Sequence, residues 1–269
     1  MITPRIGLFF AILLTIGACG APDGEKESRP GASGSGATAG TGRTNESARV
    51  VDRSAESAES AWYEAEIAAF ERSDRESMPE PGAVLFIGSS SIRMWSTLGS
   101  DMAPARVLNR GFGGSKTHEV LEVFDRIVRP YAPSAIVYYC GDNDLGTESR
   151  DSRGVADRFI AFERRAHALW PEATVMFIAI KPSIARWSNW AAMREANELV
   201  RTHCERTPQT RYLDIATPML AQSGSPDPTL FAADGLHLNA RGYEVWATVV
   251  RPSVVEAWTA SESRGTRSP

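Results

Sequence analysis

Continuous apolar runs alternate with amphipathic segments along the chain from Trp62 onward. The runs are short and rich in aliphatic or aromatic residues, which is typical of strands buried on both faces of a sheet. They are Ala83–Ile87, Ala105–Leu108, Ala135–Tyr139, Thr174–Ile180 and Arg211–Ile215. Helices are expected between and around them, at Trp62–Phe70, Thr117–Val128, Gly154–Leu169, Asn189–Arg206 and after His237. Five buried strands that alternate with helices predict a three-layer α/β/α fold with a mostly parallel five-stranded sheet.

The first nineteen residues follow a different pattern. One early charge, Arg5, precedes the apolar run Ile6–Ile16, which closes on small residues directly before Cys19. This run is short for a membrane-spanning helix and indicates a secretory signal. Small residues before a cysteine resemble the bacterial lipobox, which implies that residues 1–19 are a lipoprotein-type signal peptide and that Cys19 carries a lipid. The alternative is an ordinary signal peptide with a chance cysteine.

The rest of the chain divides by composition. Residues 20–58 are rich in Gly, Ala, Ser and Thr and contain almost no large apolar side chain. Such a segment cannot bury enough surface to offset its ordering entropy, so we expect a flexible tether. One domain is expected at 59–260, followed by a polar tail at 261–269. With a lipid on Cys19, this organisation predicts an extracytoplasmic, membrane-anchored bacterial lipoprotein on the periplasmic or cell-surface side.

Charge argues against one class of partner, and the cysteine positions argue against a disulfide. The net charge is −4 and the arginines are scattered along the chain, which argues against a nucleic-acid partner. Cys140 is expected at the carboxyl end of a strand, and Cys204 late in a helix near the opposite edge of the sheet. Extracytoplasmic cysteines can be oxidised, but this separation favours two free thiols.

Four short blocks stand at or after the ends of predicted strands: Gly88–Ser91, Asn109–Gly114, Gly141–Asp144 and Asp234–His237. Ligands of parallel α/β sheets bind beyond the carboxyl ends of the strands, so the blocks are expected to meet at one rim. Together they offer a hydroxyl nucleophile, backbone and amide donors for an oxyanion, and an acid–base pair. Acyl transfer needs this set of groups.

Each block also has a purely structural interpretation. A serine triplet can cap a helix, glycines after a strand can form a tight turn, and Asn or Asp can form an Asx turn. Gly113–Thr117 looks like a phosphate loop, but Ser115 and Arg110 occupy positions where that loop needs glycine. A metal site at the acidic residues around Asn143 is disfavoured, because only one nearby block carries a histidine. We expect no metal and no organic cofactor.

Taken together, the blocks resemble those of the SGNH (GDSL-like) hydrolases, and the resemblance runs from about Trp62 to Trp258. The family pattern Gly-Asp-Ser maps onto Gly88, Ser89 and Ser90. It implies a flavodoxin-like SGNH hydrolase fold with Ser90 as the nucleophile. The oxyanion would be held by the backbone N–H groups of Ser90 and Gly114 and by the amide of Asn143. This chain has Ser89 where the family has aspartate, which leaves the register among three adjacent serines open.

The fourth block is the most specific. Asp234 and His237 are three residues apart just before a helix, so the carboxylate can accept a hydrogen bond from the imidazole and fix its tautomer. The order Ser, Asp, His, with two residues between the last pair, differs from that of the serine proteases. The Gly-x-Ser-x-Gly elbow of the α/β-hydrolases is also absent, because position 92 is Ile.

Polar and aromatic residues near the blocks suggest a substrate pocket. The candidates, which follow the first or the fourth strand, are Arg93, Trp95, Lys181, Arg186 and Trp187. A polar cleft with aromatic walls suits a sugar or a compact acyl ester.

These features predict a serine ester hydrolase that cleaves short-chain acyl or O-acetyl esters through an acyl-enzyme intermediate. Its substrate would be a small-molecule, glycan or lipid ester. The enzymatic alternative is a lysophospholipase or thioesterase of the same family. A non-catalytic glycan-binding module is the alternative from another class, motivated by Ser89.

Overall fold

The computed structural model describes residues 63–146 and 150–265. The expected signal at 1–19 with Cys19, and the expected tether at 20–58, lie outside the described residues. Within the described part, no helix combines the length and the apolar character needed to cross a bilayer.

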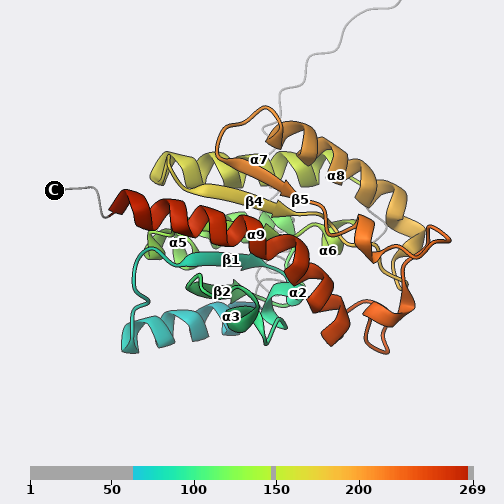
Figure 1. Ribbon diagram of the computed structural model, residues 1–269, viewed down its shortest axis with the longest axis horizontal. Coiled ribbons are helices and arrows are strands. Elements are labelled where there is room, and N and C mark those ends of the chain that lie inside the picture. The colour runs from blue at the N-terminus through green and yellow to red at the C-terminus, as the bar shows by residue number, and fades with distance from the viewer. Residues whose placement is uncertain (1–62, 147–149, 266–269) are drawn as a thin grey trace, which may run out of the picture. The chain divides into compact units, whose positions relative to one another are not determined.

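Five parallel strands form the central sheet (Figure 1). They are β1 (Val84–Gly88), β2 (Val107–Gly111), β3 (Ala135–Tyr139), β4 (Thr174–Ile178) and β5 (Thr210–Leu213), in the order β2-β1-β3-β4-β5. Every residue of β1, β3 and β4 is buried, which explains their continuous apolar sequences. β2 lies on one side of β1 in the sheet, whereas β3, β4 and β5 follow one another on its other side. The crevice beyond β1 and β3 is therefore the expected ligand site.

Helices cover both faces of this sheet. Side chains from one strand face pack against a helix over residues 63–76, α4 (Thr117–Glu122), α5 (Phe124–Ile127), α7 (Ser152–Leu169) and α8 (Trp190–Cys204). The other face packs against α2 (Ser90–Arg93), α3 (Leu98–Asp101) and α9 (Ala240–Gly265), which is red in Figure 1. The described part also contains α6 (Asp142–Leu145) and the 3₁₀ turns η1 (Arg129–Tyr131), η2 (Trp187–Asn189), η3 (Thr217–Met219) and η4 (Pro228–Leu230). The predicted three-layer α/β/α fold is confirmed.

Some boundaries differ from the prediction. β2 extends through Gly111, so the first half of the second block lies inside a strand and not after it. Asn109 supports this extension, because its side chain donates to the carbonyl of Ile92 and accepts from the N–H of Gly111. A Cβ on Gly111 would come within 2.6 Å of the backbone nitrogen of Arg93, so only glycine lets β2 pass this close to α2.

The ends of two helical segments also differ. The helix expected over Thr117–Val128 is divided into α4 and α5 at Val123. The last helix contains Pro252 and continues to Gly265, so the first residues of the expected polar tail are helical.

Both cysteines of the described part are buried free thiols. Cys140 directly follows β3, and its thiol donates to the carbonyl of Ser115. Burial raises the pKa of Cys140 well above its ordinary value and raises that of Cys204 to about 11. Neither thiol is therefore an activated nucleophile at neutral pH.

Candidate active site

Ser90 stands at a sharp turn between β1 and α2. Gly88 ends the strand with φ of +136°, and a Cβ at this position would overlap the carbonyl oxygen of Tyr139. The N–H of Ser89 donates to that same carbonyl at 3.0 Å. Ser90 is the first residue of α2, so the turn presents its hydroxyl at the carboxyl end of the sheet.

The Ser90 hydroxyl contacts a histidine from the other end of the domain. Ser90 Oγ lies 3.0 Å from His237 Nε2, and His237 Nδ1 lies 2.6 Å from Asp234 Oδ2. The other carboxylate oxygen of Asp234 accepts the N–H groups of Leu236 and His237, each at 2.9 Å. The structure therefore connects the three predicted residues in one hydrogen-bonded chain.

Asp234 is held in its ionised form. The hydrogen bond from His237, together with the backbone N–H groups of Leu236 and His237, lowers the pKa of Asp234 to about 2. Because an ionised carboxylate only accepts hydrogen bonds, His237 Nδ1 must carry the proton that faces it. When His237 is neutral, Nε2 then keeps a lone pair towards Ser90, as a general base requires.

Asn143 lies on α6, just beyond β3, and its amide is fixed at both ends. Its Oδ1 accepts from Arg186 Nη2 at 2.9 Å, and its Nδ2 donates to the carbonyl of Ser115 at 3.0 Å. An amide nitrogen carries two hydrogens, so one N–H remains for another acceptor. Because the arginine side chain can only donate hydrogen bonds, the amide oxygen of Asn143 must be the atom that faces Arg186.

Gly114 follows β2 in a left-handed backbone conformation. Its φ is +60°, a region that suits glycine. Among the described residues, the N–H groups of Ser90 and Gly114 have no acceptor. The preceding N–H, that of Gly113, donates to Glu66 Oε2 at 3.2 Å. The Ser115 carbonyl that holds Asn143 lies one residue further along the same loop.

The prediction of a substrate pocket is wrong for two of its five residues, because their side chains are buried. Trp95 is 2% exposed and packs edge-on against Phe86 and Trp246, since α2 is short and the chain after it turns inward towards α9. Lys181 is 1% exposed and binds the carboxylate of Asp142, so no substrate reaches it.

The other three expected pocket residues are at least partly accessible. Arg186 contacts Asn143 directly, as described above. Arg93 is half-exposed and forms an ion pair with Glu66, the residue that also holds Gly113. Trp187, adjacent to Arg186, is 37% exposed and stacks on Trp190.

A buried charge cluster beneath the site was missed by the sequence analysis. Asp142 Oδ2 lies 2.7 Å from Lys181 Nζ and 3.3 Å from Arg186 Nη1. Lys181 also donates to Tyr139 Oη and Ser91 Oγ. Burial alone would raise the pKa of Asp142, but the two positive charges hold it below its ordinary value. An acidic residue beside the expected oxyanion asparagine and a lysine after the fourth strand were the available signals.

The acids on either side of Asn143 are bound by other side chains. Asp142 is bound by the lysine and arginine, while Asp144 accepts the N–H and hydroxyl of Thr117 at the start of α4. Over residues 63–146 and 150–265, no group of three or more His, Cys, Asp or Glu side chains is arranged to hold a metal ion.

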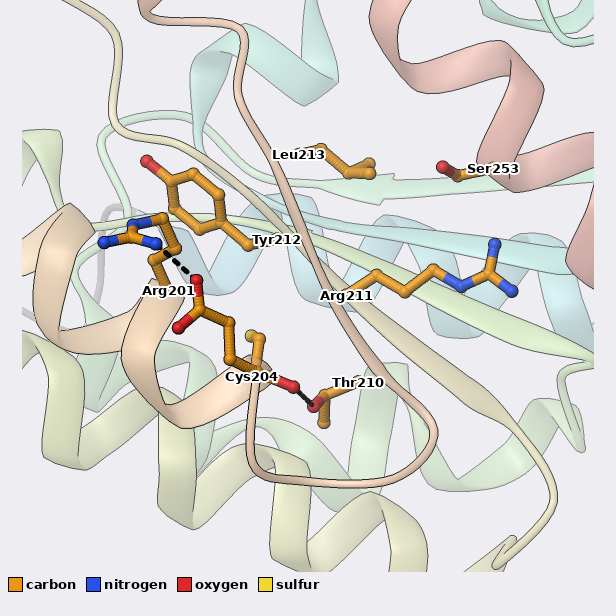
Figure 2. A pocket seen from close by; sticks show the side chains of 8 residues that line it. Arg201, Cys204, Thr210, Arg211, Tyr212, Leu213 and Ser253 are labelled. Atoms are coloured by element: carbon orange, nitrogen blue, oxygen red, sulfur yellow. Dashed lines mark hydrogen bonds and ion pairs between the residues drawn. The ribbon is translucent and has the colours of Figure 1, made fainter.

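A separate cavity of about 430 Å³ opens at the β5 edge of the sheet (Figure 2). It is lined by Arg201, Cys204, Glu205, Thr210, Arg211, Tyr212, Leu213 and Ser253. Its charged groups already form ion pairs: Arg201 binds Glu198 and Glu205, and Arg211 binds Glu256. None of the four blocks contributes a residue to it, so its lining provides no chemistry for the expected reaction.

Comparison with known proteins adds a family assignment. The model of the GDSL-like lipase/acylhydrolase family matches residues 88–245, which include all four blocks. No curated protein sequence matches the chain.

Solved structures with a similar fold include three informative examples. A protein from Streptococcus pneumonia, provisionally described as a platelet activating factor, is 19% identical with a TM-score of 0.66, over 77% of this chain and 99% of that one. A GDSL-like lipase from Bacteroides thetaiotaomicron is 17% identical with a TM-score of 0.59, over 71% and 99% of the two chains. A carbohydrate esterase family 3 protein from Talaromyces cellulolyticus is 15% identical with a TM-score of 0.53, over 66% and 99%. At these identities the likeness establishes the fold.

Proposed function

Because the chain belongs to the GDSL-like lipase/acylhydrolase family, we propose that it is a serine ester hydrolase acting on short-chain acyl or O-acetyl esters. The observation that carries this proposal is the hydrogen-bonded chain at the rim of the sheet. Ser90 Oγ is 3.0 Å from His237 Nε2, and His237 Nδ1 is 2.6 Å from Asp234. Ser90 is then the nucleophile, His237 the general base, and Asp234 the residue that orients His237.

The reaction proceeds in two acyl transfers. His237 Nε2 takes the proton of Ser90 as Oγ attacks the ester carbonyl, and the carbonyl oxygen becomes an oxyanion. The N–H groups of Ser90 and Gly114 and the free N–H of Asn143 stabilise this charge. The tetrahedral intermediate collapses, and the leaving alcohol takes the proton from His237. Water then attacks the acyl-enzyme with His237 again as the base, which releases the acid and restores Ser90.

Neutral donors suit this role, because they need no change of protonation state during the reaction. Asp234 also stays ionised at any pH well above 2, so it supports the imidazolium that forms in each transfer.

The substrate class is inferred from the rim and from similar structures. Trp187 offers a partly exposed aromatic face beside Arg186, and aromatic faces suit sugars and compact esters. Two structures with the same fold are named a carbohydrate esterase and an acetyl esterase mutant with acetate ion. These similarities favour a short acyl group over the long chain of a lysophospholipid.

The test combines an active-site probe with a series of esters. A fluorophosphonate probe should label the wild-type protein at Ser90, and Ser90→Ala should remain unlabelled. With p-nitrophenyl esters of increasing chain length, kcat/KM should be highest for acetate or butyrate. A maximum at long chains would support the lysophospholipase alternative. Absence of both labelling and turnover in the folded protein would support the glycan-binding alternative.

A further inference from the structure

We propose that Arg186 is a positioning residue for the oxyanion site: it holds the Asn143 amide and is itself held by Asp142. This inference rests on the proposed function, because it concerns how the expected oxyanion donor is oriented. Arg186 belongs to none of the four blocks. It lies in the loop between β4 and η2, and so reaches the site from a different part of the chain.

The guanidinium binds three acceptors around Asn143. Arg186 Nη2 donates to Asn143 Oδ1 at 2.9 Å, and Nη1 donates to the backbone carbonyl of Asp142 at 2.7 Å. Nη1 also lies 3.3 Å from the Asp142 carboxylate. The rigid fork of arginine therefore fixes the asparagine side chain relative to its own backbone. Lysine has a single nitrogen and cannot make this arrangement.

The orientation of the Asn143 amide depends on this contact. Arg186 holds the oxygen end, and the Ser115 carbonyl takes one hydrogen of the nitrogen end. The second N–H is then directed away from both partners and is free for the oxyanion. Without Arg186, the Ser115 carbonyl alone would orient the amide. A misplaced donor loses much of its value, because oxyanion stabilisation requires a fixed geometry before the reaction.

Charge adds to this effect. The buried cluster holds two positive side chains, Lys181 and Arg186, against the single carboxylate of Asp142. It therefore has a net positive charge, and Arg186 brings part of this charge to the oxygen of the Asn143 amide. Such a charge polarises the amide and favours the negative oxyanion over the neutral ester carbonyl. Lys181 is itself 1% exposed, so solvent screens this field only weakly.

Two neighbouring segments, at Gly146 and Gly235, set the position of Arg186. A Cβ on Gly146 would overlap Arg186 Nε, so the chain has glycine where the guanidinium passes. The preceding residue, Ala185, donates its N–H to the carbonyl of Gly235 at 3.1 Å. The loop that carries Arg186 is thus joined to the turn that holds Asp234 and His237, which gives it a defined position beside the site.

The first experiment separates kcat from KM. Arg186→Met should lower kcat for p-nitrophenyl acetate by roughly 10–10²-fold with little change in KM, because only the transition state carries the oxyanion. Arg186→Lys, which keeps a positive charge but lacks the fork, should lose less activity. It also serves as the test variant if Arg186→Met does not fold.

The matched control is Arg211→Met, because Arg211 lies on the edge strand β5 away from the blocks and pairs with Glu256 of α9. Its kcat should match that of the wild type.

The second experiment is a double-mutant cycle with Asn143→Ala. If Arg186 acts through the amide, its replacement should cost little additional kcat once the amide is gone. Equal losses in the presence and absence of Asn143, or unchanged kcat per titrated site in both Arg186 variants, would overturn the inference. Failure of the proposed function itself is distinguishable, because the wild-type protein would then neither react with fluorophosphonate nor turn over esters.

Discussion

At the scale of single residues, the two proposed catalytic side chains His237 and Asn143 each have one end fixed by a neighbour and a second polar group left for the reaction. His237 uses Nδ1 for Asp234 and presents Nε2 to Ser90. Asn143 uses its oxygen and one hydrogen and keeps the second hydrogen free. A site arranged in this way needs little reorganisation when charge develops in the transition state.

The serine triplet gives a sharp test of register. Ser90→Ala should lower kcat by at least ~10⁴-fold while the protein remains folded, as loss of a nucleophile typically does. Ser89 Oγ is buried and has no hydrogen-bond partner within residues 63–146 and 150–265, so Ser89→Ala should leave kcat and stability nearly unchanged. Ser91 Oγ accepts a hydrogen bond from Lys181. Ser91→Ala should therefore lower the melting temperature and leave kcat nearly unchanged. A full loss of turnover in Ser89→Ala or Ser91→Ala, with activity retained in Ser90→Ala, would show that the assigned nucleophile is wrong.

A second prediction concerns the neutral oxyanion donor. Asn143→Ala should lower kcat by roughly 10²–10³-fold with little change in KM, because the oxyanion exists only during acyl transfer. If Asn143 only shapes the turn after β3, the variant would melt earlier, and its folded fraction would keep normal turnover. Active-site titration beside kcat distinguishes these results. A normal kcat per titrated site would remove Asn143 from the mechanism.

At the scale of elements, the sequence predicts the long segments well and the four-residue helices poorly. α7 and α8 have enough turns to show a repeating apolar face, whereas α2 and α6 have a single turn each. These two short helices carry Ser90 and Asn143, so motifs and not periodicity predicted the site. Trp95 and Lys181 were misjudged for the same reason. Their positions after a strand were visible in the sequence, but the direction of a side chain after a single-turn helix or a loop was not.

Lys181 connects several elements, and its removal should have a pH-dependent effect. In the wild-type protein the pKa of Asp142 lies below its ordinary value of 3.8. The stabilisation from this pairing is therefore present at neutral pH and is lost as the pH falls below about 4. In Lys181→Met the carboxylate stays buried with Arg186 as its remaining charged partner. Removing one partner of a buried pair costs roughly 3–5 kcal/mol, and we expect the lower end.

Burial should then raise the pKa of Asp142 in the Lys181→Met variant, so that the carboxyl takes up a proton more readily in the folded than in the unfolded state. The difference in the free energy of unfolding between wild type and variant should therefore narrow as the pH is lowered from about 7 to 5. Urea unfolding at both values measures this difference. Arg201→Met, which removes a partly exposed arginine that pairs with Glu198 and Glu205 at the protein surface, should show little effect at either pH. A gap for Lys181→Met that does not change with pH would contradict the assigned role.

At the scale of the whole molecule, the fold class follows from the sequence because continuous apolar runs and amphipathic segments alternate. The strand order β2-β1-β3-β4-β5 does not follow from that pattern, since neighbours such as β1 and β3 are separated by β2 in the chain. The order decides where the blocks meet. It places Ser90 and Asn143 beyond adjacent strands, while the long loop between β5 and α9 brings His237 to the same rim.

The connection of this domain to a membrane remains a proposal that rests on the sequence before Tyr63. We propose that Cys19 carries a lipid, because a charged start, an apolar run and small residues lead directly into it. The full-length chain, expressed in a bacterium that lipidates exported proteins, should enter the detergent phase in a partition experiment. Cys19→Ala should move to the aqueous phase and keep its kcat for a soluble ester, because the described domain contains all the proposed catalytic groups. Cys204→Ala is the matched control, since that thiol is buried and free, and it should partition like the wild type. A wild-type protein found in the aqueous phase, with mass spectrometry showing an unmodified Cys19, would rule out the anchor and leave the assignment of the catalytic groups intact.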